Sequence, residues 1–119
     1  MKRHSFKKLQ IWSDSINLIN NTYSITTKFP DIKKYGLRSQ LNRRAVSIAS
    51  NIVEGFSKRS NKHFTQFLEI SLGSAFEWET QVIVSNNLGY ITDKEFSTLE
   101  DKISIKQKKI SNFIDRLNE

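Results

Sequence analysis

Residues 37–55 read LRSQLNRRAVSIASNIVEG and carry the clearest helical pattern of the chain. Their apolar side chains recur every three or four positions, which is the spacing of one face of an amphipathic α-helix. That face comprises Leu37, Leu41, Ala45, Ile48 and Ile52. A second apolar set lies roughly 100° around the same helix; it comprises Val46, Ala49, Val53 and Phe56. The combined apolar arc is wider than one pair of packed helices requires.

Outward from this stretch, the few Gly and Pro residues divide the chain into four segments with helical periodicity. Pro30 suits the first turn of the second helix, and Gly55 suits its C-cap. Thr92 and Glu95 form a capping box that starts the last helix, and Ser60 or Asn61 can cap the third. We therefore expect helices over roughly residues 6–28, 30–54, 61–88 and 93–117.

Four long helices joined by short connections predict an all-α fold. The simplest arrangement is an up-down-up-down antiparallel four-helix bundle that forms a single domain over residues 1–119. Gly73-Ser74 lies in the middle of the third helix at a cost of about 1 kcal/mol in helix propensity. We expect a neighbouring helix to approach closely at that point.

The charge is strongly asymmetric along the chain. The 119 residues carry 19 Lys and Arg against 12 Asp and Glu, a net charge of +7. Nine of the bases fall within residues 28–62, which contain only two acids. Such a patch attracts phosphate backbones or acidic surfaces. The chain has no Cys and no apolar run longer than Val82-Ile83-Val84, so we expect a soluble cytoplasmic protein without a membrane contact.

The sequence carries no pattern typical of an enzyme or a metal site. His4 and His63 stand alone, and no Glu-x-x-His pair of the kind that binds metals in helical bundles occurs. Glycine-rich phosphate loops and nucleophile elbows are absent as well. We expect a protein that is not an enzyme and uses no cofactor.

A polar row follows the edge of the apolar stripe on the second helix. Its members are spaced alternately by four and three residues; they are Gln40, Arg44, Ser47, Asn51 and Glu54. A row of this kind beside a core is typical of a structural hydrogen-bond network. Glu77 lies near the edge of the apolar face of the third helix, and we expect it to pair with Arg44 because a half-buried carboxylate needs a partner.

The loop after the second helix is the best candidate for phosphate contacts. Lys58, Arg59 and Lys62 stand just before a helix N-terminus, whose free N–H groups favour anions. The alternative is a solvated loop whose charges serve solubility. Four further cations are candidates for phosphate contacts; they are Arg43, Arg38, Lys33 and Lys34. They do not lie on one face, so a monomer would distribute them around the helix, whereas an oligomer could bring them together on one surface.

Several motifs resemble a known family. They are Phe6-x-x-Leu9-x-x-Trp12, Tyr23-x-x-Thr26-x-x-Phe29-Pro30, Tyr35-Gly36-Leu37-x-x-Gln40-Leu41, Arg44-Ala45-x-Ser47-Ile48-x-Ser50-Asn51-Ile52-x-Glu54-Gly55, Phe64-x-x-Phe67-Leu68 and Gly73-Ser74-x-x-Glu77. In order and spacing they resemble the bacterial 23S rRNA intervening-sequence proteins. One departure is Ala49, where that family usually has Pro.

The resemblance implies a left-handed four-helix bundle that assembles into a ring-like homopentamer. The family is also similar to the accessory variability proteins of diversity-generating retroelements, which bind nucleic acid and a reverse transcriptase. We therefore expect a homo-oligomer that binds nucleic acid, structured RNA rather than DNA, through phosphate contacts. The alternative is a protein-interaction module whose basic patch binds an acidic protein partner.

Overall fold

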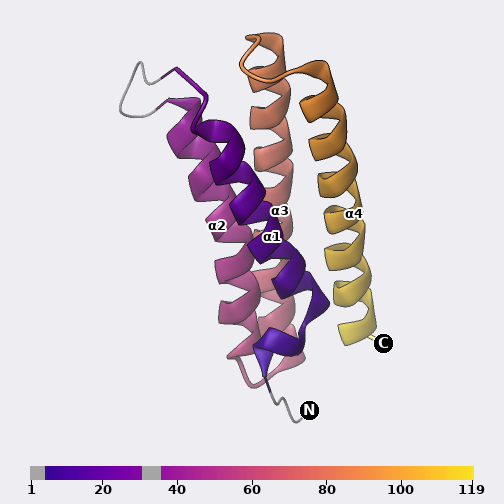
Figure 1. Ribbon diagram of the computed structural model, residues 1–119. Coiled ribbons are helices and arrows are strands. Elements are labelled where there is room, and N and C mark those ends of the chain that lie inside the picture. The colour runs from indigo at the N-terminus through magenta and orange to yellow at the C-terminus, as the bar shows by residue number, and fades with distance from the viewer. Residues whose placement is uncertain (1–4, 31–35) are drawn as a thin grey trace.

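The computed structural model describes residues 5–30 and 36–119, and every element in them is helical. Successive long helices run in opposite directions, so the chain forms an up-down-up-down four-helix bundle (Figure 1). This confirms the predicted all-α fold. The elements are the short 3₁₀ helix η1 (Phe6–Lys8), α1 (Gln10–Thr26), α2 (Leu37–Phe56), α3 (Asn61–Asn87) and α4 (Asp93–Leu117).

Local capping signals start the last two long helices. The Glu95 N–H donates to Thr92 Oγ1 at 3.0 Å and the Thr92 N–H donates to Glu95 Oε1 at 2.9 Å, which completes the predicted capping box. At the start of α3, Ser60 Oγ accepts a hydrogen bond from the His63 N–H at 3.1 Å. Gly89 follows α3 with a φ of 77°, a conformation that favours glycine.

The first helical segment is interrupted at Leu9. Its backbone is extended, with φ −76° and ψ 122°, so α1 begins at Gln10 and the expected continuous helix from residue 6 is wrong. The Phe6 ring lies 5.1 Å from the Trp12 ring and 6.3 Å from the Phe56 ring, measured between centroids. The break therefore lets Phe6 pack on α1 and α2, a tertiary contact that no local pattern predicts.

The start of α2 also differs from the prediction. Gly36 is the N-cap and Leu37 the first helical residue, and Pro30 lies outside the helix, so its assignment to the first turn of α2 is wrong. Phe29 is buried, and its carbonyl accepts a hydrogen bond from Arg38 Nη2 at 2.6 Å. These contacts hold the chain after α1 against the bundle.

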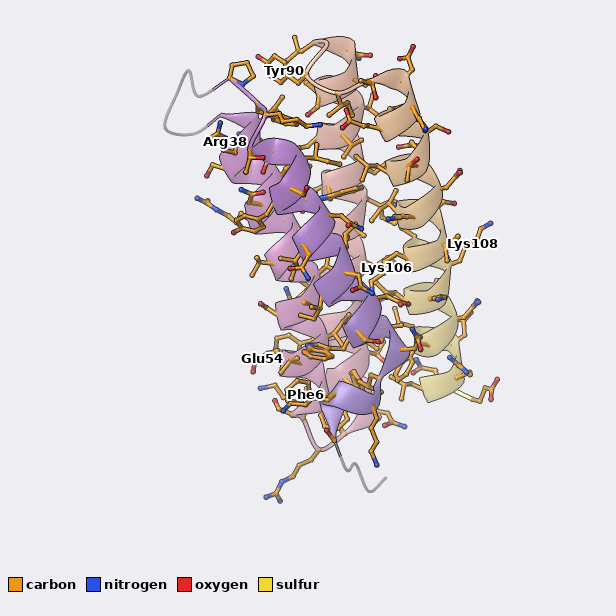
Figure 2. The ribbon with its side chains drawn as sticks, in the orientation of Figure 1. Phe6, Arg38, Glu54, Tyr90, Lys106 and Lys108 are labelled. Atoms are coloured by element: carbon orange, nitrogen blue, oxygen red, sulfur yellow. The ribbon has the colours of Figure 1, made fainter. Side chains whose placement is uncertain are left out.

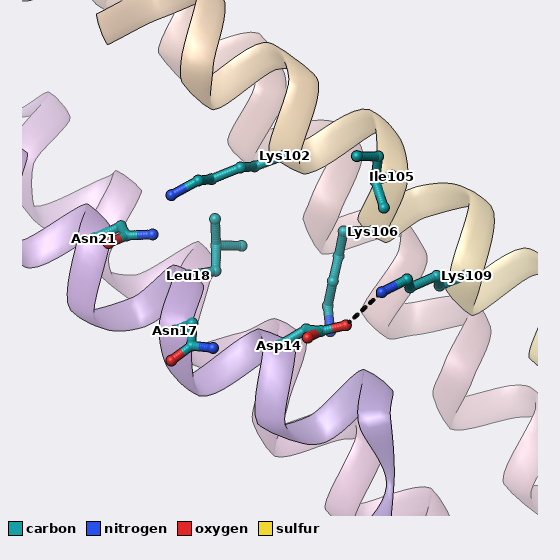
Figure 3. A pocket seen from close by; sticks show the side chains of 8 residues that line it. All are labelled: Asp14, Asn17, Leu18, Asn21, Lys102, Ile105, Lys106 and Lys109. Atoms are coloured by element: carbon teal, nitrogen blue, oxygen red, sulfur yellow. Dashed lines mark hydrogen bonds and ion pairs between the residues drawn. The ribbon is translucent and has the colours of Figure 1, made fainter.

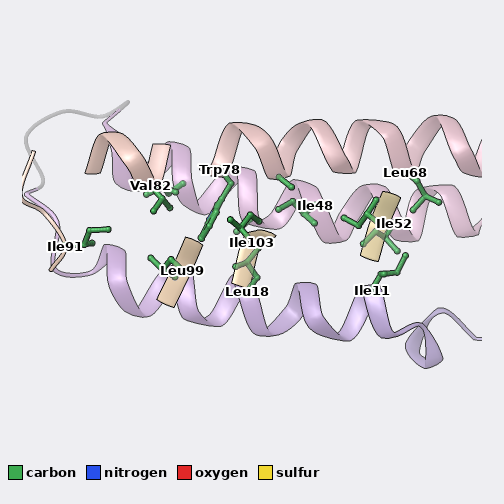
Figure 4. Packing of buried hydrophobic residues seen from close by; sticks show 14 of the residues in the cluster. Ile11, Leu18, Ile48, Ile52, Leu68, Trp78, Val82, Ile91, Leu99 and Ile103 are labelled. Carbon is green, nitrogen blue, oxygen red and sulfur yellow. The ribbon is translucent and has the colours of Figure 1, made fainter. Parts of the chain in front are cut away.

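Apolar side chains from all four long helices meet along the bundle axis (Figure 4). Trp78 is the largest fully buried side chain, and its indole N–H donates to Thr22 Oγ1 at 3.1 Å, so its polar atom is satisfied. The apolar stripe predicted on α2 is buried from its second member onward. The core also contains Ile11, Leu18, Phe64, Leu68, Ala75, Val82, Ile91, Leu99, Ile103 and Ile110.

Two glycines are expected from the sequence to mark a helix end and a close approach. Gly55 lies near the end of α2 as expected, although the C-cap itself is Ser57. A Cβ at Gly55 would lie 2.8 Å from Phe64 Cδ1 and 2.9 Å from Phe67 Cβ, so α2 and α3 approach closely here. A Cβ at Gly73 would meet nothing within 4 Å, so the close approach expected at Gly73-Ser74 is made by Ser74 alone, whose Oγ lies 2.9 Å from Ser47 Oγ on α2.

No helix in the described part of the chain combines the length and apolar character that a membrane span needs.

We predict opposite effects for alanine at these two glycines. Gly55→Ala should lower the free energy of unfolding by about 1–3 kcal/mol, because its methyl group overpacks against Phe64 and Phe67. Gly73→Ala should raise it by up to about 1 kcal/mol, because alanine is the better helix former at this open position. Urea denaturation followed by circular dichroism measures both. An unchanged or raised stability for Gly55→Ala would contradict the close approach.

Candidate nucleic-acid interface

Four separate segments place cations at one end of the bundle. The loop between α2 and α3 lies at this end together with η1, since Phe6 packs on Phe56, and with the end of α4, since Asn61 Nδ2 donates to the Leu117 carbonyl at 3.3 Å (Figure 2). We call this surface the basic end; it comprises Lys7, Lys8, Lys58, Arg59, Lys62 and Arg116. Sequence reasoning missed Lys7, Lys8 and Arg116, because only the tertiary fold brings them to the loop.

The three loop cations selected from the sequence differ in their surroundings. Lys58 Nζ lies 3.3 Å from a Glu54 carboxylate oxygen and 5.1 Å from the centroid of the Phe67 ring. Lys58 therefore contributes to local structure. Arg59 and Lys62 are exposed, and no ion pair joins either of them to another described residue. An anionic partner can therefore contact these two cations without breaking an ion pair between described residues.

The N-terminus of α3 offers less to an anion than the sequence indicated. Ser60 Oγ already accepts from the His63 N–H, and Ser60 O accepts from the Phe64 N–H at 3.1 Å. In addition, α1 and α3 begin at this end whereas α2 and α4 end there, so the helix dipoles largely cancel. Any attraction for phosphate at the basic end therefore comes mainly from its side-chain charges.

The remaining cationic candidates lie away from the basic end. Arg38 is 20 positions before Lys58, about 30 Å along a helix, and its guanidinium donates to the Phe29 carbonyl. Arg43 is exposed near the middle of α2, about 22 Å from Lys58 by the same measure. Lys33 and Lys34 lie outside the described residues. One chain does not gather these candidates into a single patch.

The polar row on α2 lies along α3. Ser47 Oγ and Ser74 Oγ are 2.9 Å apart, and Asn51 Nδ2 donates to the Ser47 carbonyl at 2.9 Å. Arg44 Nη2 lies 3.4 Å from Glu77 Oε2, which brings together the pair expected from the sequence. Both of these side chains are more than one third exposed. A surface pair of this kind contributes at most about 1 kcal/mol.

Gln40 and Glu54 are the outermost members of the polar row on α2. Gln81 Nε2 donates to Gln40 Oε1 at 3.3 Å, and Glu54 pairs with Lys58 along α2. Gln40, Arg44 and Ser47 therefore connect α2 to α3. Asn51 and Glu54 instead contact Ser47 and Lys58, which do not belong to α3.

Lys106 is a charged residue in the core. The helical spacing of α4 places it in the apolar seam, and only 3 % of the residue is exposed. Its ammonium group donates to the Ile11 carbonyl on α1. Burial lowers the pKa of Lys106 to about 8, although the nearby Asp14 carboxylate opposes that effect. The buried charge of Lys106 therefore lowers the free energy of unfolding.

We predict that removal of this buried amine stabilises the fold in a pH-dependent way. Below pH 8 Lys106 is charged in both states, and the folded state bears the cost of burial; above its unfolded pKa near 10.5 it is neutral in both. Lys106→Met should therefore raise the free energy of unfolding at pH 7. Its advantage over the parent protein should shrink by about 3 kcal/mol between pH 8 and 10.5.

Denaturant titrations at several pH values measure this difference. Lys108→Met is the matched control, because Lys108 is exposed on the same helix (Figure 2). A pH-independent difference between the Lys106→Met variant and the parent protein would contradict the assignment of the buried charge.

Among the described residues, no three His, Asp or Glu side chains are grouped so that they could hold a metal ion. The arrangement of the basic end consists of exposed cations on a rigid helical scaffold. It is suited to binding an anionic surface.

The fold and this site define a small, basic four-helix bundle protein. The sequence profile of the 23S rRNA-intervening sequence proteins matches residues 7–112, and the chain belongs to that family. The chain is also similar to the crystal structure of a protein of unknown function from the S23 ribosomal protein family of Bacteroides thetaiotaomicron. The two are 21% identical, the similarity covers 87% of this chain and 97% of that one, and the TM-score is 0.80. No curated protein matches the chain in sequence.

Proposed function

We propose that this protein is a non-enzymatic homo-oligomer that binds nucleic acid, RNA rather than DNA, through its basic end. The observation that carries the proposal is the convergence of six cations from four segments on one end of the bundle. Three carboxylates share this end, so its net charge is +3; they are Glu54, Asp115 and Glu119. The name of the family, which refers to 23S rRNA, supports RNA as the ligand.

The contacts should be to phosphates and not to bases. The aromatic rings near the basic end pack on one another: Phe56 lies 6.3 Å from both Phe6 and Phe64 between ring centroids. They are therefore engaged within the bundle and are poorly placed to stack on a base. Binding through Arg59 and Lys62 would follow the shape and charge of the nucleic acid with little sequence preference.

Exposed apolar residues support self-association, with the pentamer implied by the family resemblance as the expected state. Four large apolar side chains on α3, one directly after it and one on α2 are exposed, which is unusual for a soluble monomer of this size. They are Val46, Ile70, Phe76, Ile83, Val84 and Leu88. A ring of copies would also bring several basic ends and Arg43 residues to one ligand, which raises avidity without new contacts.

The oligomeric state is tested by measuring the molar mass of the protein in solution. Light scattering coupled to gel filtration should give about five times the 13.9 kDa of one chain. A 13.9 kDa species at all protein concentrations would contradict self-association.

RNA binding is tested by anisotropy of a labelled, structured rRNA fragment at about 50, 100 and 200 mM salt. The logarithm of the binding constant should fall linearly with the logarithm of salt concentration, because phosphate contacts release counterions. The Arg59→Gln/Lys62→Gln variant should bind more weakly and reduce the salt slope by about 1–2 per chain. This variant leaves the Lys58–Glu54 pair intact.

The Lys94→Gln/Lys108→Gln variant is the control, because it removes the same charge from exposed positions on α4 away from the basic end. Equal weakening by both variants would show that only net charge matters. No binding at low salt would contradict the proposal, and the basic end would then be tested against acidic protein partners, the alternative function.

A further inference from the structure

A groove separates α1 from α4 along the open seam of the bundle. These two helices contact each other much less than the other neighbouring pairs do. The groove contains a cavity of about 250 Å³ lined by Asp14, Asn17, Leu18, Asn21, Lys102, Ile105, Lys106 and Lys109 (Figure 3). A second cavity of about 250 Å³ continues it toward the start of α4 and shares Asn21 and Lys102 with the first.

The chemistry of the first cavity is that of an anion site. Its three lysines and one aspartate give a net charge of +2. Lys109 Nζ lies 3.0 Å from Asp14 Oδ2, so the only carboxylate in the lining is already neutralised. Burial alone would raise the pKa of Asp14, but hydrogen bonds from Gln10 and Lys109 outweigh it and the pKa is lowered, so Asp14 keeps its charge and its partner.

Three polar side chains of the cavity have donors to spare. Within the described part of the chain, Lys102 makes no ion pair, and the Asn17 and Asn21 amides make no hydrogen bond. Figure 3 shows the Asn21 amide on α1 facing the end of Lys102 across the groove, with Asn17 one turn earlier on α1 and the end of Lys106 beside Asp14. Ammonium and amide donors arranged on two walls are suited to an oxyanion with several acceptor oxygens.

Lys106 is a second, independent reason to expect an anion in this groove. A cation in the core lowers stability, and residues that break packing rules in this way are expected at functional sites. The Ile11 carbonyl is a neutral partner and Asp14 is shared with Lys109, so the charge of Lys106 is only partly compensated. An anion in the adjacent cavity would complete that compensation.

We propose that this groove binds a phosphate monoester, held by the ammonium groups of Lys102 and Lys106 and by the amides of Asn17 and Asn21. A phosphate monoester is mostly dianionic near neutral pH and therefore matches the net charge of +2, which a single carboxylate does not. Leu18 and Ile105 form apolar parts of the lining, on which the organic part of the ligand can rest. The site lies on the α1–α4 seam and is separate from the basic end.

The test is isothermal titration of the full-length protein with inorganic phosphate and with AMP. Lys102→Gln removes an exposed cation without a structural partner and should weaken phosphate binding about tenfold or more. Lys106→Met should weaken it at least as much, and thermal melting shows whether each variant is folded. Lys108→Gln removes an equal charge from the outer face of α4 and should stay within about twofold of the parent protein.

Two sources of the phosphate monoester are distinguished by further ligands. A short RNA with a 5′-phosphate is compared with the same RNA carrying a 5′-hydroxyl, and AMP is compared with adenosine. Preference for the phosphorylated RNA over both its twin and AMP would identify an RNA end as the ligand, and equal binding of AMP would identify a free nucleotide.

If Lys102→Gln and Lys106→Met weaken phosphate binding no more than Lys108→Gln does, the proposal is wrong. This outcome is separate from failure of RNA binding at the basic end. The Arg59→Gln/Lys62→Gln variant leaves the groove intact, and the groove variants leave the basic end intact.

Discussion

The close packing of α2 against α3 sets the positions of the other helices and of the loop between the two. Small residues make it possible: Gly55 admits Phe64 and Phe67, Ser47 meets Ser74, and Ser71 Oγ donates to the Ile48 carbonyl at 2.8 Å. A larger side chain at these contacts would separate the helices. The pair forms the most extensive helix contact of the bundle, and its connecting loop carries Lys58 and Arg59.

The seam between α1 and α4 is packed much more loosely than the α2–α3 pair. Here the helices are joined mainly by long polar side chains, through the Lys109–Asp14 pair, the Lys28–Glu95 pair and the Lys106 contact to the Ile11 carbonyl. Such contacts hold helices together while leaving space between them. The bundle thus combines one side that small residues pack closely, which gives rigidity, with one open side, where a ligand can enter without disturbing the core.

Local sequence signals predicted much of the fold. The Thr92–Glu95 capping box and the Ser60 cap depend on neighbours within one helical turn, and the structure contains both. The buried stripe on α2 follows from helical periodicity alone. The failures at Leu9 and Pro30 lie beside tertiary contacts, of Phe6 with Trp12 and Phe56 and of Arg38 with the Phe29 carbonyl, and spacing along the chain does not carry that information.

The four long helices, their order, the antiparallel bundle and the basic loop follow from periodicity, caps and charge, which are local properties. Which cations share a surface depends instead on tertiary packing, since Lys7, Lys8 and Arg116 reach the loop through the contacts of η1 and α4. Tertiary packing also decides that Lys106 lies in the core beside an open groove. A seam position in one helix becomes a buried charge only when a second helix, 95 residues away at Ile11, covers it.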